Sequence, residues 1–358
     1  MIKVLVVEDS PAMCEFMVHI LGSDSGIQVI GAVSNGEEAV EVIHRIKPDV
    51  ITMDINMPKM NGFEATRRIM ETFPVPIVIV SATWDTKEIS TTFLALEAGA
   101  VAVLEKPRGI GHPEYESMAK NLIQTVKLMS EVKVVRRWAG GVHRKKAVTR
   151  GPVSGKITEE GRRIVEEEIR LVAMGASTGG PLVLKSILSG LPKDFSIPVV
   201  IVQHMAAGFI QGFADWLGRK SVLPVGIAID GSYLLPGRIY IAPDSFQMRI
   251  EKDGKVALTK DAPENGLRPS VSYLFRSVAE SFGKHAVGIL LTGMGKDGAE
   301  ELKLMKEKGA ITIAQDKESS VIHGMPGEAI KLNAATYVST PEKIIEILIN
   351  LLNDWRVP

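Results

Sequence analysis

Short apolar runs alternate with helical patterns along most of the chain, and this alternation restricts the fold more than any other feature. Between residues 1 and about 125 it occurs five times. The runs are rich in Val and Ile without polar alternation, which is typical of parallel strands covered on both faces. Five such units predict an open, doubly wound α/β sheet. The expected strands lie near residues 2–7, 28–33, 49–53, 76–81 and 100–105, and the expected helices near 11–22, 36–46, 62–72, 86–98 and 113–130.

A second domain is expected after a change of composition. Segment 126–168 has a basic half, an acidic half and several glycines, which indicates a linker. From 169 to 358 the alternation resumes and predicts a mainly parallel α/β domain, with a hairpin strand at 255–259 and a closing helix from Thr340. Two domains, 1–125 and 169–358, suit a chain of 358 residues. The strands of the second domain are expected near 170–174, 198–203, 238–242, 286–292 and 310–314.

Composition excludes several classes of protein. The 42 basic and 42 acidic residues balance, which argues against a general nucleic-acid binder. No apolar run reaches about 18 residues, so we expect no membrane insertion. Cys14 is the single cysteine, so no disulfide framework or cysteine metal site is expected. The chain starts with a strand-like segment rather than a signal peptide, and we expect a cytoplasmic protein.

Polar side chains follow four of the five strands expected in the first domain. Glu8 and Asp9 follow the first strand, Asp54 the third, Ser81 closes the fourth and Lys106 follows the fifth. These strand ends converge on one crevice of a doubly wound sheet. Crowded carboxylates need a cation, and Mg²⁺ suits a site made of oxygens. The lysine and the hydroxyl could then hold oxygens of a phosphoryl group on Asp54.

With these motifs the first domain resembles the receiver domain of two-component response regulators. The resemblance rests on residues 7–10, 53–62, 81–82 and 106–107. It implies that Asp54 accepts a phosphoryl group from a histidine kinase and that Ser81 and Lys106 contact and sense it. The Mg²⁺ ligands that it implies are Glu8, Asp9, Asp54 and the backbone carbonyl of Asn56. One departure is Val103, which stands where receivers often carry an aromatic switch residue.

Ser177 lies in a segment typical of a nucleophile. An apolar run ends at Gly175, the sequence continues as Ala-Ser-Thr-Gly-Gly-Pro, and a helical pattern starts near Pro181. This strand, turn and helix fit the G-x-S-x-G elbow, which exposes the serine hydroxyl at a helix N-terminus. The alternatives are a glycine-rich turn that only packs and one that binds a phosphate.

Two further polar residues follow apolar runs and complete a possible triad. His204 could take the proton of Ser177, and Asp297 could orient the imidazole. The chain order Ser, His, Asp differs from that of the α/β-hydrolases. As alternatives, His204 could be structural, and Asp297 could be a turn residue or a helix cap.

The second domain resembles the CheB-type protein-glutamate methylesterases. The resemblance rests on residues 175–181, 203–205, 268–271, 291–298 and 314–320. It implies that Ser177 attacks a glutamyl methyl ester of a chemoreceptor, with His204 as base and Asp297 orienting it. It also implies oxyanion donors at the N–H of Met294 and near Thr178, deamidation of receptor glutamines and no cofactor in this domain.

Several residues differ from the usual pattern of the methylesterase family and leave alternatives open for the function. Ala206 and Ala207 replace two prolines, Asp244 stands where a glycine is usual, and Leu267 stands where a histidine is often found. The chain could instead be a catalytically weak adaptor, or an esterase of a non-motility pathway.

The domain order leads to the hypothesis that the unphosphorylated receiver covers the Ser177 cleft and that phosphorylation of Asp54 relieves the block.

Overall fold

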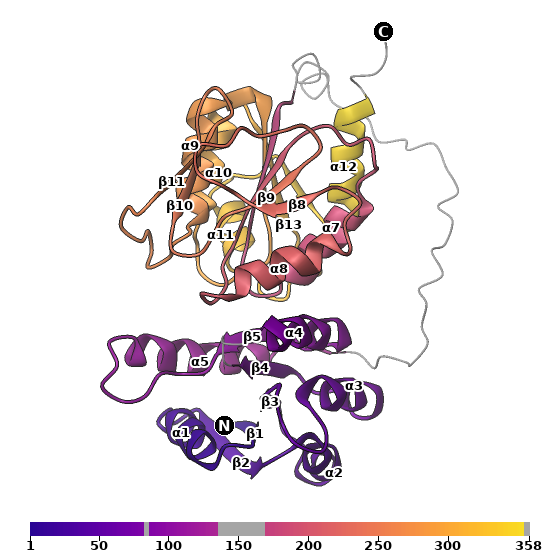
Figure 1. Ribbon diagram of the computed structural model, residues 1–358, viewed down its shortest axis with the longest axis vertical. Helices are drawn as coiled ribbons and strands as arrows, with labels where there is room; N and C mark the ends of the chain where they lie inside the picture. Colours follow the sequence, from indigo (N-terminus) through magenta and orange to yellow (C-terminus); the bar gives the residue numbers. More distant parts are fainter. Residues whose placement is uncertain (82–85, 135–168, 354–358) are drawn as a thin grey trace. The chain divides into compact units, whose positions relative to one another are not determined.

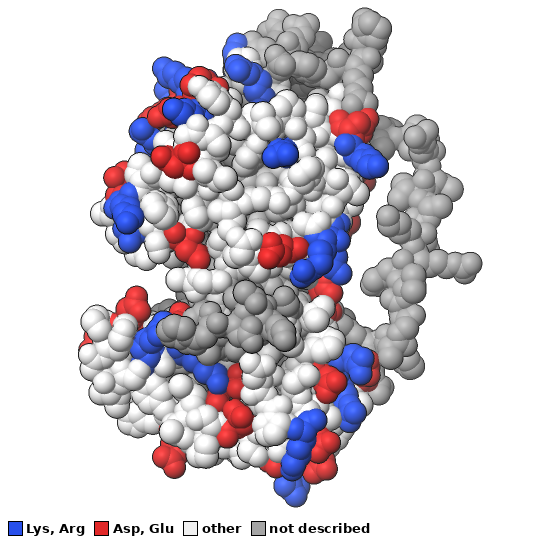
Figure 2. Space-filling view, viewed as in Figure 1, with Lys and Arg blue, Asp and Glu red and all other residues white. Residues whose placement is uncertain are grey.

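A computed structural model describes residues 1–81, 86–134 and 169–353 of the chain. The chain divides into two compact units, Met1–Ala139 with Met205–Trp216, and Gly140–His204 with Leu217–Pro358. Most of the expected linker lies outside the described residues. On the face in Figure 2, acidic and basic side chains are interspersed over both units, in keeping with the zero formal net charge.

The first unit contains the five expected strand–helix pairs (Figure 1). Each strand lies within a few residues of its expected position. The helices begin where the sequence places caps, because Ser10, Asn35 and Asn61 each accept a hydrogen bond from the first turn of a helix. The elements are β1 (Ile2–Val7), α1 (Pro11–Gly22), β2 (Ile27–Val33), α2 (Gly36–Ile46), β3 (Val50–Met53), α3 (Gly62–Thr72), β4 (Ile77–Ser81), α4 (Thr86–Ala98), β5 (Ala102–Glu105) and α5 (Tyr115–Met129).

The five strands form a parallel sheet in the order β2-β1-β3-β4-β5. Strands β3 and β4 are buried along their whole length, as the Val- and Ile-rich runs predicted. Helices α1 and α5 cover one face, and α2, α3 and α4 cover the other (Figure 1). The chain reverses its direction of winding between β1 and β3, where a doubly wound sheet forms a crevice. Glu8, Asp9 and Asp54 therefore follow the two strands that border this crevice.

The second unit is built on seven parallel strands and a separate hairpin. The hairpin strand expected at 255–259 is β11, which pairs antiparallel with β10. The short strands β8, β10 and β14 were not predicted. The elements are β6 (Leu171–Ala176), α7 (Gly180–Gly190), β7 (Val199–Gln203), β8 (Val225–Ile227), β9 (Ile239–Ile241), β10 (Gln247–Ile250), β11 (Val256–Thr259), α9 (Val271–Ser281), the 3₁₀ helix η2 (Gly283–His285), β12 (Ala286–Leu290), α10 (Ala299–Glu307), β13 (Ile311–Gln315), α11 (Met325–Lys331), β14 (Tyr337–Ser339) and α12 (Pro341–Asn353). Helix α8 (Phe209–Gly218) follows β7 in the chain, and all but its last two residues belong to the first unit.

The strand order β14-β13-β12-β6-β7-β9-β8 places a second reversal of winding between β6 and β12. Helix α9 packs with α10, and α7 packs with α12, on opposite sides of the sheet (Figure 1). Ser177 follows β6, His204 follows β7 and Asp297 lies beyond the end of β12. Because these three strands are neighbours, their carboxyl ends bring the three residues to the same edge of the sheet.

Candidate functional site

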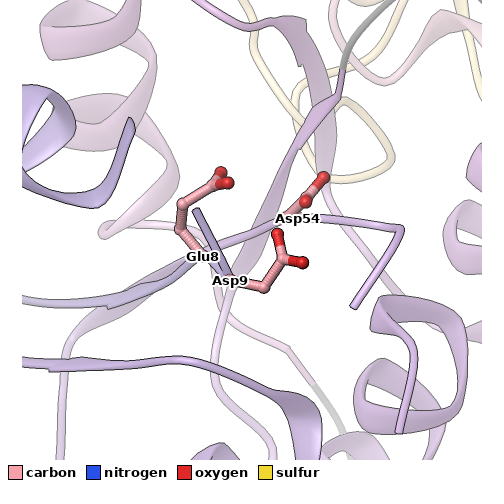
Figure 3. Close-up of side chains that lie close together, drawn as sticks. All are labelled: Glu8, Asp9 and Asp54. Atoms are coloured by element: carbon pink, nitrogen blue, oxygen red, sulfur yellow. The ribbon is translucent and has the colours of Figure 1, made fainter. Parts of the chain in front are cut away.

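The acidic residues of the first unit converge as expected. Glu8, Asp9 and Asp54 each bring a carboxylate oxygen within 4.8 Å of the others (Figure 3). Glu8 and Asp54 are buried, whereas Asp9 is exposed. Burial, followed by the negative charge of Asp54, raises the pKa of Glu8 above its ordinary value. Such a cluster of oxygens has the donor chemistry that Mg²⁺ prefers.

Lys106 joins this cluster from the end of β5. Its Nζ lies 2.9 Å from a carboxylate oxygen of Glu8 and 3.0 Å from one of Asp54. Burial favours the neutral amine, but the charges of Asp54 and Glu8 outweigh it and raise the pKa of Lys106. Ser81 is fully buried at the end of β4, and its carbonyl accepts the N–H of Lys106 at 3.0 Å. Asn56 is exposed two residues after Asp54.

A tight turn presents Ser177 between β6 and α7. The N–H of Ser177 donates to the carbonyl of Thr292 at 3.0 Å, and the carbonyl of Ser177 accepts from Gly180 at 2.8 Å. Gly179 has φ of +81°, a left-handed conformation that favours glycine. A Cβ on Gly293 would lie 2.7 Å from the Cβ of Ser177, so only glycine leaves room beside the serine. The strand, turn and helix expected around Ser177 are thus present.

His204 and Asp297 form a buried pair. Nε2 of His204 lies 2.9 Å from Oδ2 of Asp297, and the two side chains are 9% and 2% exposed. The N–H of His204 donates to the carbonyl of Ala176, one residue before Ser177, at 2.9 Å. Since Nε2 is bound to the carboxylate, Nδ1 is the ring nitrogen that remains to accept the proton expected from Ser177. No hydrogen bond from the Ser177 hydroxyl is found within the described residues.

Helix α9 holds Asp297 in place. The Asp297 carboxylate accepts hydrogen bonds from the hydroxyl of Ser270 (2.8 Å) and from the N–H groups of Val271 (2.7 Å) and Ser272 (3.2 Å). These groups are the N-cap residue and the first two residues of α9, where the helix dipole favours an anion. Burial alone would raise the pKa of Asp297, but the hydrogen bond and charge of His204, followed by those serines, lower it to about 2. Asp297 is therefore ionised at neutral pH, and Nε2 of His204 donates to it.

Thr292 was not predicted as part of this site. Its buried hydroxyl lies 2.9 Å from the carbonyl of Thr178 and 3.1 Å from that of Ile322. From the loop after β12 it thereby contacts both the turn after β6 and the loop after β13. A threonine directly after an apolar strand was the available signal, but only the three-dimensional neighbours reveal the role.

Comparisons with known proteins find relatives of both parts of the chain. The CheB methylesterase family model matches residues 172–348, and the response regulator receiver domain model matches residues 4–112. A Nitrosospira multiformis protein named protein-glutamate methylesterase/protein-glutamine glutaminase is 56% identical, over 98% of this chain and 97% of its own length. The chain belongs to the CheB methylesterase family. A relative of the same name from Syntrophus aciditrophicus is 57% identical, over 98% of both chains.

A solved structure also resembles the second unit. The crystal structure of the Thermotoga maritima CheB methylesterase catalytic domain matches with a TM-score of 0.50 and 40% identity, over 52% of this chain and all of that one. The expected family, the two α/β folds and the methylesterase class of enzyme are thus confirmed. No helix among the described residues is both long and apolar enough to cross a bilayer. The individual roles of the site residues remain predictions.

Proposed function

We propose that this enzyme removes methyl esters from glutamyl side chains of chemoreceptors, and deamidates receptor glutamines, under control of phosphorylation at Asp54. The observation that carries the catalytic part is the His204–Asp297 pair at the same edge of the sheet as Ser177. The receiver site and the names of the relatives support the regulatory part and the substrate.

The first half of the reaction forms an acyl-enzyme. Oγ of Ser177 adds to the ester carbonyl carbon while its proton passes to Nδ1 of His204. The C–O bond to the methoxy group then breaks, and methanol leaves with that proton. Asp297 holds the imidazole through Nε2 and offsets its positive charge. With a glutamine substrate the leaving group is ammonia.

The second half restores the enzyme. Water gives a proton to Nδ1 of His204 and adds to the acyl carbon. The bond to Ser177 then breaks, and the proton returns to Oγ. In both halves the carbonyl oxygen becomes an anion that needs donors, each worth typically about 3 kcal/mol. We assign this role to the N–H groups of Thr178 and Met294, which have no hydrogen-bond partner within the described part of the chain.

At the receiver, Glu8, Asp9, Asp54 and the Asn56 carbonyl would hold Mg²⁺, which would offset the charge of a transferred phosphoryl group. A histidine kinase of the chemotaxis pathway is the proposed donor. Asp54 supplies the accepting carboxylate oxygen. Lys106 already contacts Asp54, and with Ser81 it would bind the phosphoryl oxygens. The surplus of carboxylates around one lysine is what favours a cation here.

The test measures methanol released from a methylated cytoplasmic receptor fragment. We compare the wild-type chain, the same chain with Mg²⁺ and a small-molecule phosphodonor, and Ser177→Ala. Release that requires Ser177 and rises with the phosphodonor would support the proposal. No release by a wild-type chain that still takes up phosphate on Asp54 would contradict the proposed substrate and would favour the adaptor alternative.

A further inference from the structure

Gln203, the last residue of β7, bridges the two proposed catalytic residues through their backbones. Its side chain is buried, with 2% of the residue exposed. The amide nitrogen lies 2.9 Å from the carbonyl oxygen of Ser177 and 2.8 Å from that of His204. Because an NH₂ group carries two hydrogens, a single side chain can satisfy both carbonyls at once.

The contact with Ser177 also determines where an adjacent N–H points. The carbonyl of Ser177 and the N–H of Thr178 belong to the same planar trans peptide and point in opposite directions. The carbonyl is held by two donors, Gln203 and the N–H of Gly180 at 2.8 Å. The Thr178 N–H is therefore directed away from both donors, and it has no hydrogen-bond partner within the described residues.

The second proposed oxyanion donor is arranged in the same way by different means. The carbonyl of Gly293 shares a peptide with the Met294 N–H, and it accepts from Gly324 at 3.1 Å and Met325 at 2.9 Å. Both of these donors are backbone groups at the start of α11. The Met294 peptide is thus fixed by main chain alone, whereas the Thr178 peptide is held by one main-chain donor, the N–H of Gly180, and by one side chain, that of Gln203.

We propose that Gln203 is a positioning residue, which aims the Thr178 N–H at the developing oxyanion and fixes the spacing of Ser177 and His204. This proposal rests on the proposed function. The start of α7 is shaped around the carboxamide, because a Cβ on Gly180 would lie 2.2 Å from Oε1 of Gln203. Gln203 itself does not touch the substrate and acts through the two backbones that it holds.

The test uses two replacements of similar size. Gln203→Met removes both donors and keeps an apolar chain of similar length, and Gln203→Glu replaces the NH₂ group by oxygen. The control is Thr312→Val, which removes another buried hydrogen bond to the main chain of the same unit, from Thr312 Oγ1 to the Ala334 carbonyl. Circular dichroism and thermal unfolding identify the folded variants.

For a folded Gln203 variant we expect kcat to fall about 10- to 100-fold. This is less than the loss on removing an oxyanion donor outright, because Gly180 still holds the Ser177 carbonyl. KM for the receptor fragment should stay within about threefold, since ground-state binding is unchanged. A kcat within about twofold of the Thr312→Val value, or a loss in KM alone, would overturn the proposal.

A second readout separates this inference from the proposed substrate. The rate at which a fluorophosphonate modifies Ser177, with loss of fluoride, needs the serine, its base and the oxyanion donors but no receptor. We expect this rate to fall about as much as kcat in the Gln203 variants and to be unchanged in Thr312→Val. If the wild type releases no methanol but this dependence holds, the substrate is wrong and the positioning role stands. Unchanged reactivity in the Gln203 variants would refute the role.

Discussion

Asp297 shows how one side chain can link a helix to the proposed catalytic base, His204. Its two oxygens receive four hydrogen bonds, from His204, Ser270, Val271 and Ser272. A carboxylate accepts but cannot donate, so it matches this set of donors completely. The carboxylate therefore has no freedom to turn away from the imidazole.

Asp297→Asn should lower kcat by about 10³- to 10⁴-fold, the order of loss seen when a triad carboxylate becomes an amide. Either orientation of the amide places an NH₂ group against donors, so the imidazole loses its fixed tautomer. Methanol release measures the effect. Asp253→Asn, in an exposed turn where the carboxylate accepts from Lys255 N–H, is the control and should stay within about twofold. Equal losses in the two variants would contradict this role of Asp297.

The low pKa of Asp297 also predicts how stability depends on pH. A pKa lowered from 3.8 to about 2 means that the folded state favours the ionised form. The resulting stability, about 2 kcal/mol, is present above pH 4 and is lost as the pH falls through about 2. Urea unfolding of wild type and Asp297→Asn should thus differ most above pH 4 and converge toward pH 2. A constant difference from pH 5 to pH 2 would contradict this.

Among the elements, the start of α3 packs closely against Asp54, the proposed phosphorylation site. The N–H of Gly62 donates to the carbonyl of Ile55 at 2.9 Å, and a Cβ on Gly62 would lie 2.0 Å from the carbonyl oxygen of Asp54. Backbone cannot move aside as a flexible side chain can. The close approach of helix and loop therefore requires glycine at this position.

Gly62→Ala should destabilise the receiver by about 1–3 kcal/mol, the usual cost of overpacking, and should slow phosphorylation of Asp54. Gly22→Ala, in the last turn of α1, is the matched control because a Cβ there meets nothing within 4 Å. We expect the control to be as stable as the wild type or slightly more stable. Thermal unfolding and phosphate uptake would check both variants. A Gly62→Ala protein with wild-type thermal stability and phosphate uptake would show that the contact between residue 62 and the Asp54 carbonyl tolerates a side chain.

For the whole molecule, the two sites belong to different sheets with the same design. Each lies at the carboxyl ends of parallel strands where the winding reverses, between β1 and β3 and between β6 and β12. The receiver site is rich in carboxylates around one lysine. The esterase site holds a serine, an imidazole and a single carboxylate that is fully hydrogen-bonded. The first suits a cation and a phosphoryl group, and the second suits acyl transfer.

Asp54→Asn should abolish the response of the esterase to phosphorylation and leave its basal rate. The amide cannot accept a phosphoryl group, and Ser177, His204 and Asp297 are untouched. The response is measured as the increase in methanol release when a small phosphodonor and Mg²⁺ are added. EDTA should abolish the response of the wild type, as Asp54→Asn does. Ser177→Ala, the reciprocal control, should still take up phosphate. A rise with the phosphodonor in Asp54→Asn would place the regulatory site elsewhere.

The local features of both sites could be predicted from the sequence. Apolar runs, glycine turns and helix caps depend on neighbouring residues, so the strand ends carrying Asp54, Ser177 and His204 were located correctly. The short edge strands β8 and β14 were missed because each has only three residues and neither is fully buried, whereas the equally short β9 is fully buried and lies in a continuous apolar run.

What only the tertiary structure decided is which distant groups meet. The pairing of β6 with β12, the bond from Nε2 of His204 to Asp297, the hold of α9 on that carboxylate and the bridge made by Gln203 all join segments far apart in the chain. A sequence pattern records which side chains follow a strand. It does not record strand order, ring orientation or the direction of a peptide N–H, because these depend on packing between segments that the chain brings together only when it folds.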